Sequence, residues 1–175
     1  GFGVATRVET VAVMLLFALS GSIGPFIGQN WGAGRLDRVR DGIRVAYQFA
    51  LVWGGLTAIV LILFGTTFAA WVDATPEVVI TAALYLGVVP WSFGLWGVLM
   101  VATASFNALG RPIPSTILSF TRMFLVYVPL AMLMDQWLGY RGIFVATAIS
   151  NVVIGLTGYY WFKRAFLNEP GPVMA

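Results

Sequence analysis

Long apolar stretches dominate this sequence and constrain its fold more than any motif does. Each stretch reaches the ~20 residues that a helix needs to cross about 30 Å of bilayer hydrocarbon. Only 10% of the 175 residues are charged, whereas soluble domains carry roughly 25%. A helix satisfies its own backbone hydrogen bonds, which lipid cannot do. We therefore predict an all-α, polytopic membrane helix bundle with spans near residues 4–28, 45–71, 78–102, 115–136 and 142–162.

Positive charges are unevenly divided between the two ends of this predicted bundle. One end carries Arg141, with Arg7 nearby. The other end carries Arg35, Arg38, Arg40, Arg44, Arg111, Lys163 and Arg164. Because Arg-rich and Lys-rich loops stay in the cytoplasm, we expect a multi-pass plasma (inner) membrane protein. We expect residues 1–167 to form the membrane bundle and residues 168–175 to form a tail. In this orientation the C-terminal tail lies in the cytoplasm. An odd number of spans that begins outside also predicts at least one further helix before residue 1.

Several function classes are poor interpretations of these residues. The sequence has no Cys and no His, which removes thiolate chemistry and imidazole metal ligands. Neither a nucleophile–base constellation nor a phosphate-binding loop is found, so we expect no enzyme, no metal and no cofactor. The basic segment 35–44 is short and tethered to membrane spans, so nucleic-acid binding is a poor interpretation. A short interfacial helix with a charged face beside anionic headgroups explains it better.

A cluster of glycines, one proline and two amides lies at the end of the first predicted span. Residues 24–34 read Gly-Pro-Phe-Ile-Gly-Gln-Asn-Trp-Gly-Ala-Gly. Proline releases the helical backbone, small residues admit a second helix, and side-chain amides can bond freed backbone groups. The positions expected to act as hinges or packing points are Pro25, Gly28, Gly32 and Gly34. The alternative is that the last two glycines only cap the helix, with Gln29 and Asn30 in interfacial water.

Two later spans are each interrupted by a proline. Pro90 lies in the middle of the third span, and Pro129 lies inside the fourth. Trp91 and Trp96 flank Pro90 and are candidates for an aromatic cavity that attracts organic cations through cation–π contacts. Packing in the core or against lipid explains these two indoles equally well.

Charged and amide side chains within the spans are the remaining candidates for a substrate or ion pathway. Arg7 and Glu9 are two residues apart, so they point to different helix faces. Glu9 is a candidate for cation coupling, although an acid in interfacial water, or paired with an arginine, is the simpler interpretation. Arg122 faces either a cavity or the interface. Gln29 and Asn107 either gate one end of the bundle or form helix–helix hydrogen bonds, worth about 0.6 kcal/mol each.

Three ordered motifs together resemble one transporter family. Gly28-Gln-Asn-Trp-Gly-Ala-Gly34, preceded by Ala5-Thr-Arg-Val-Glu9, is similar to the Gly-Gln-x-x-Gly-Ala-Gly signature of the multidrug and toxic compound extrusion (MATE) transporters. Asn107-Ala-Leu-Gly-Arg-Pro112, and Arg122 followed by Val128-Pro-Leu130, resemble that family's later helices. The resemblance implies helices eight to twelve of twelve, without the first lobe and helix seven. It also implies antiport of H⁺ or Na⁺ against an amphipathic organic substrate by alternating access.

One departure from the family bears on coupling. Some members carry an acidic residue in their tenth helix, whereas residues 78–102 contain none. Coupling would then reside in the first lobe, or Glu9 would substitute. Two other functions fit these residues less well. A flippase for lipid-linked oligosaccharides would favour a strongly basic cavity, for which Arg7 and Arg122 are too few. A non-transporting scaffold subunit would explain packing glycines, but not interrupted spans with charges inside them.

Overall fold

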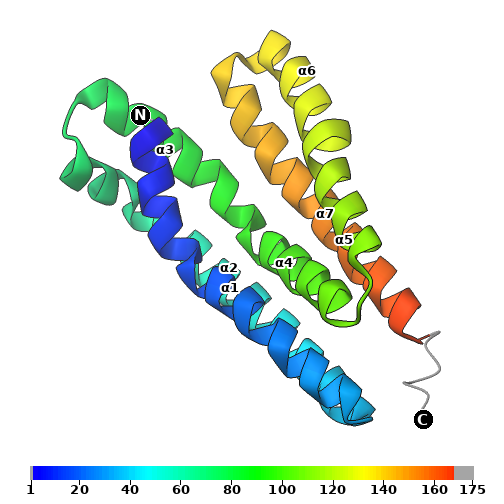
Figure 1. Cartoon of the computed structure of the whole chain (residues 1–175). Helices are drawn as coiled ribbons and strands as arrows, with labels where there is room; N and C mark the ends of the chain where they lie inside the picture. Colours follow the sequence, from blue (N-terminus) through cyan, green and yellow to red (C-terminus); the bar gives the residue numbers. More distant parts are fainter. Residues whose placement is uncertain (1, 168–175) are drawn as a thin grey trace.

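The computed structural model describes residues 2–167, which form helices and no strand (Figure 1). The elements in chain order are α1 (Phe2–Gly32), α2 (Leu36–Val72), α3 (Pro76–Val88), the 3₁₀-helix η1 (Val89–Ser92), α4 (Phe93–Ala108), α5 (Pro112–Phe120), the π-helix η2 (Thr121–Tyr127), α6 (Val128–Leu138) and α7 (Tyr140–Leu167).

Five helical segments are long and apolar enough to cross a membrane. They are Phe2–Gly32, Leu36–Val72, Pro76–Ala108, Pro112–Leu138 and Tyr140–Phe166. The predicted all-α class with five spans is thereby confirmed. The predicted tail, 168–175, lies outside the described residues. A separate interfacial helix over 35–44 is wrong, because residues from Leu36 onward are the first turns of α2.

The interrupted third segment is the centre of the bundle. Figure 1 shows α3, η1 and α4 running between the α1 and α2 pair on one side and α7 with α5 and α6 on the other. α4 packs against α1, α2 and α7, and Phe93 and Phe106 are among its fully buried side chains. α5, η2 and α6 pack mainly on α7 and α4, so this limb is the least enclosed part of the described chain.

The glycine-rich end of α1 is a helix cap rather than an internal break. Gly34 has a φ of 69°, a conformation that glycine adopts without steric cost. The Arg35 amide donates to the Asn30 carbonyl at 2.8 Å, and the Gly34 amide donates to the Trp31 carbonyl at 3.0 Å. These two bonds satisfy carbonyls that the helix end leaves open, as a Schellman motif does. The capping alternative is therefore the one that the structure supports at Gly34.

The hinge expected at Pro25 does not interrupt the helix. α1 continues through Pro25 to Gly32, because loss of one amide donor removes a single hydrogen bond from a helix that neighbouring helices hold in place. Asn30 does bond the backbone, through Nδ2 to the Phe26 carbonyl at 2.8 Å. That carbonyl is not the one that Pro25 leaves without a donor, which belongs to Gly21 four residues earlier.

Close helix packing occurs at other glycines than those expected. A Cβ at Gly28 would meet only the Ala108 carbonyl oxygen at 3.9 Å, and one at Gly32 would meet nothing within 4 Å. No described helix therefore packs closely at Gly32, and its packing role stays a prediction. A Cβ at Gly54 would instead lie 2.2 Å from the Gly94 nitrogen, and one at Gly155 would lie 2.4 Å from the Leu95 carbonyl oxygen. Small residues thus bring α2 and α7 onto α4.

Both later spans lose α-helical geometry close to their prolines. Pro90 lies within η1, where the Phe93 amide donates to the Pro90 carbonyl. Pro129 is the second residue after η2, and a wider π turn is a common way to accommodate a disrupted i→i−4 ladder. The two interruptions predicted from sequence therefore exist, one as a 3₁₀ turn and the other as a π-helical segment.

Candidate functional site

A chain of three polar side chains, two buried and one partly buried, connects the two interrupted spans through α7. Arg122 in η2 donates from Nη1 to Asn151 Oδ1 at 2.6 Å. Asn151 Nδ2 in turn donates to Ser92 Oγ in η1 at 3.0 Å, and Ser92 Oγ donates to the Val89 carbonyl at 2.7 Å. Asn151 is 2% exposed and Ser92 is fully buried. Because buried polar groups are costly unless they are paired, this chain fixes η1, η2 and α7 relative to one another.

An aromatic face completes the surroundings of Arg122. Its guanidinium carbon lies 5.9 Å from the centre of the Trp96 ring, a cation–π distance. The Trp96 ring also contacts Phe93 at 6.1 Å and Phe17 at 5.8 Å between ring centres. Trp91, the other candidate indole, is 67% exposed. The structure therefore brings Trp96 to the site and leaves Trp91 on the outer surface of the described chain.

Glu9 forms a second polar contact, with Tyr85 near the C-terminal end of α3. The Tyr85 hydroxyl donates to Glu9 Oε2 at 2.6 Å, and the contact is partly buried. Arg7 is exposed, so the two residues point to different faces as expected. Within the described residues, the hydrogen-bond partner of Glu9 is a tyrosine.

Aromatic rings surround the contact between Glu9 and Tyr85. Phe2 and Phe144 lie 5.5 and 5.1 Å from Tyr85 between ring centres. A cavity of about 450 Å³ opens beside them. Its lining residues are Phe2, Thr81, Tyr127, Tyr140, Ile143 and Phe144. The space has few charged groups but many π faces, which suits a flat apolar or aromatic group.

The two polar contacts lie along one line through the bundle. Phe144 and Asn151 are seven residues apart in α7, so they share a helix face two turns apart, about 10 Å. Phe144 contacts the Tyr85 ring, and Asn151 forms a hydrogen bond with Ser92. α3 with η1 and α7 contact each other over this length. A carboxylate at one end and a guanidinium at the other therefore border the same inter-helical region, with aromatic side chains between them.

Gln29 and Asn107 lie at the far end of the bundle. The ends of α1 and α4 meet there, since the Ala108 carbonyl oxygen lies 3.9 Å from where a Cβ of Gly28 would be. Both candidate side chains are exposed. The structure thus places them at one end together without showing a contact between them, and their gating role stays a prediction.

Sequence reasoning missed three residues of this site. Ser92 and Tyr85 occur singly in apolar stretches, and no local pattern distinguishes them from core residues. Asn151 follows Ser150 within another apolar stretch. A buried amide in an apolar span is the signal that was available for Asn151. Its pairing with Arg122 spans 29 positions, which only the tertiary structure reveals. Among the described residues, no group of three or more Asp, Glu, His or Cys side chains is placed to hold a metal ion.

Interrupted membrane helices are typical of secondary transporters. The comparisons with known proteins agree. The MatE family model matches residues 1–133. The chain is 33% identical over 163 residues to the FAD transporter of Shewanella oneidensis, covering 93% of this chain and 36% of that protein. It is 24% identical over 172 residues to the probable multidrug resistance protein YoeA of Bacillus subtilis, covering 93% and 37%.

A solved structure gives the same result for the fold. A mutant of the Vibrio cholerae MATE transporter VcmN superposes with a TM-score of 0.92 at 29% identity, covering 97% of this chain and 39% of that one. This chain belongs to the multidrug and toxic compound extrusion (MATE) family, whose members are transporters. It spans less than two fifths of the length of these relatives.

Proposed function

We propose that this chain forms five helices of the second lobe of an antiporter. The whole protein would exchange H⁺ or Na⁺ for an amphipathic organic or drug-like molecule by alternating access, with no enzymatic step and no resident cofactor. The observation that supports this most directly is the Arg122–Asn151–Ser92 chain, which ties η2 and η1 to α7. Interrupted helices joined in this way can move as one body against a second bundle.

The partners would be membrane lipids, a small organic substrate and a first lobe contributed by the same protein. The span Pro112–Leu138 supports this. Only 6% of the residues in its apolar 18-residue stretch are buried, against 44% in the corresponding stretch of Pro76–Ala108. Its apolar surface therefore needs lipid or protein to cover it. Location in the plasma (inner) membrane, with the C-terminus in the cytoplasm, remains part of the proposal and follows from the positive charges at one end.

A second candidate substrate is flavin adenine dinucleotide (FAD), which the Shewanella oneidensis relative is named for. The observation that favours it is Arg122 beside Trp96. A guanidinium attracts phosphate and an indole stacks on a planar ring, whereas an organic cation would be repelled by Arg122. The flippase alternative gains less support, because Arg122 is the one cation of this polar chain.

One transport experiment tests both coupling and substrate. Inverted vesicles that contain the full-length protein should accumulate substrate only while an H⁺ or Na⁺ gradient exists. Uptake that is unaffected when both gradients are collapsed would show that the coupling proposal is wrong. Arg122→Gln should reduce uptake of FAD at least 10-fold while sparing a cationic dye. A loss confined to the dye would exclude the flavin candidate, and the exposed Arg141→Gln is the matched control.

A further inference from the structure

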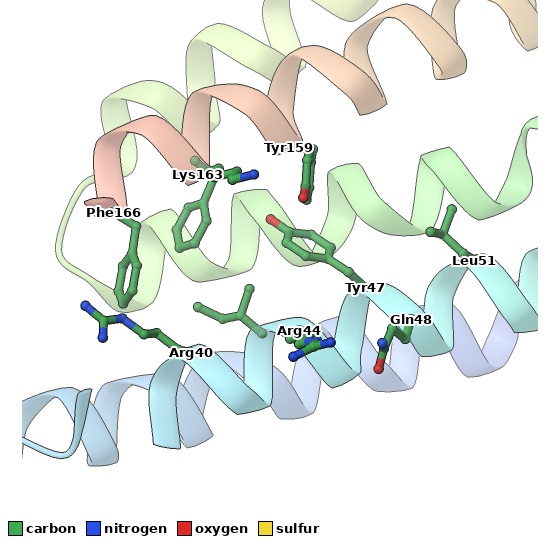
Figure 2. A pocket seen from close by; sticks show the side chains of 10 residues that line it. Arg40, Arg44, Tyr47, Gln48, Leu51, Tyr159, Lys163 and Phe166 are labelled. Carbon is green, nitrogen blue, oxygen red and sulfur yellow. The ribbon is translucent and has the colours of Figure 1, made fainter. Parts of the chain in front are cut away.

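A groove lies between α2 and α7, away from the polar chain described above (Figure 2). Its volume is about 480 Å³. Arg40, Arg44 and Lys163 line the part that is nearest the start of α2 and the end of α7, and Leu51 lines the part that is deepest along α2. The groove therefore changes from basic to apolar as it runs from the helix ends toward the middle of the two spans.

Helical spacing makes this gradient continuous. Arg40, Arg44, Tyr47 and Leu51 follow each other at intervals of four, three and four residues, which places them on one face of α2. Eleven residues of helix correspond to a stripe about 16 Å long. On α7 the lining residues are Tyr159, Phe162, Lys163 and Phe166, at intervals of three, one and three residues, which also places them on one helix face. Two complementary stripes thus face each other across the groove.

The basic end of the groove carries positive charges that acidic side chains of the described residues do not neutralise. Among the described residues, Arg44 and Lys163 have no acidic partner, and Arg40 makes only a loose ion pair with Asp37 at 3.7 Å. Arg40 lies 5.8 Å from the centre of the Phe166 ring, and the Lys163 ammonium lies 5.9 Å from that of Tyr159. The aromatic rings of α7 therefore hold cationic groups at the mouth of the groove while leaving their donors available.

A buried hydroxyl without a partner lies where the basic and apolar parts meet. Tyr47 is 8% exposed, and no described atom forms a hydrogen bond with its hydroxyl. Its ring contacts Tyr159 at 5.3 Å between centres, and Figure 2 shows the two tyrosines facing each other across the groove. A buried hydroxyl normally has a partner. An acceptor oxygen of a bound molecule would satisfy this one.

We propose that this groove binds one anionic phospholipid from the leaflet at the basic end of the bundle. Arg44 and Lys163 hold its phosphate, the Tyr47 hydroxyl donates to a phosphate or ester oxygen, and an acyl chain lies along the apolar part toward Leu51. Basic residues at a membrane surface recognise anionic headgroups. A free phosphate compound would leave the apolar part empty, and a neutral lipid would leave the cations unpaired.

Native mass spectrometry of the full-length protein in detergent, titrated with phosphatidylglycerol, tests this site. We expect one phosphatidylglycerol to bind more tightly than the others, and at least 10-fold more tightly than phosphatidylcholine. Arg44→Gln combined with Lys163→Gln should weaken that one binding event about 10-fold. Tyr47→Phe should weaken it about threefold. Arg44 and Lys163 are exposed, so the double variant should fold, and far-UV circular dichroism checks this.

The matched control is Arg38→Gln combined with Arg164→Gln, which removes the same charge from exposed side chains outside the groove. It should bind phosphatidylglycerol as the unchanged protein does. An equal loss in the control would show general attraction to the basic surface and would overturn the proposal. Equal affinity for phosphatidylcholine would also overturn it, as would displacement of the lipid by inorganic phosphate or a dimer that closes the groove.

Discussion

The contact between α2 and α4 at Gly54 offers the sharpest test of the packing described here. A Cβ at Gly54 would lie 2.2 Å from the nitrogen and 2.3 Å from the Cα of Gly94. Both are backbone atoms, so no side chain can rotate away and the helices must separate. Gly55, the next residue, is exposed, and a Cβ there would meet nothing within 4 Å.

Comparing Gly54→Ala with Gly55→Ala separates packing from helix propensity. Both changes gain about 1 kcal/mol of helix propensity, so this contribution cancels in the comparison. Overpacking costs typically 1–3 kcal/mol, and a clash with backbone belongs at the upper end of that range. We therefore expect Gly54→Ala to be about 3 kcal/mol less stable than Gly55→Ala, which is more than 100-fold in the folding equilibrium.

The assay is unfolding of each full-length variant in mixed micelles of increasing sodium dodecyl sulfate content, followed by far-UV circular dichroism. Gly55→Ala should unfold at the same or a higher denaturant fraction than the unchanged protein, and Gly54→Ala at a clearly lower one. If the two variants unfold together, α2 and α4 do not approach each other at Gly54 and the packing account is wrong.

Two further predictions concern the polar contacts. Asn151→Leu removes the acceptor of Arg122 and the donor to Ser92, and loss of a hydrogen bond to a charged group should cost about 2 kcal/mol of unfolding free energy in the same assay. Ser150→Ala, which removes only a bond within α7, should cost less than half as much; equal losses would refute the bridging role. Glu9→Gln keeps an acceptor for Tyr85 but cannot titrate. It should leave the fold intact and abolish the dependence of vesicle transport on an H⁺ gradient, whereas unchanged transport with unchanged pH dependence would reduce Glu9 to a structural residue.

The fold class, the number of spans and two helix interruptions follow from the local sequence. Long apolar runs in a chain with few charges can persist only as membrane helices, so the fold class and the number of spans follow from hydropathy. A proline cannot donate to the helical ladder, so the interruptions near Pro90 and Pro129 follow from the residues themselves. A proline by itself does not determine whether the surrounding residues stay α-helical. Around Pro25 they keep α1 helical.

Side-chain partners across the bundle depend on how the helices pack. The sequence proposed Glu9 and Arg122 as functional charges, but it did not indicate that Tyr85 and Asn151 are their partners. Those pairings join residues 76 and 29 positions apart, and they depend on rotation of each helix about its axis. That rotation is set where glycines such as Gly54 and Gly155 let helices touch. Hydropathy therefore determines that these segments enter the membrane as helices, whereas packing of their backbones decides which polar side chains meet inside.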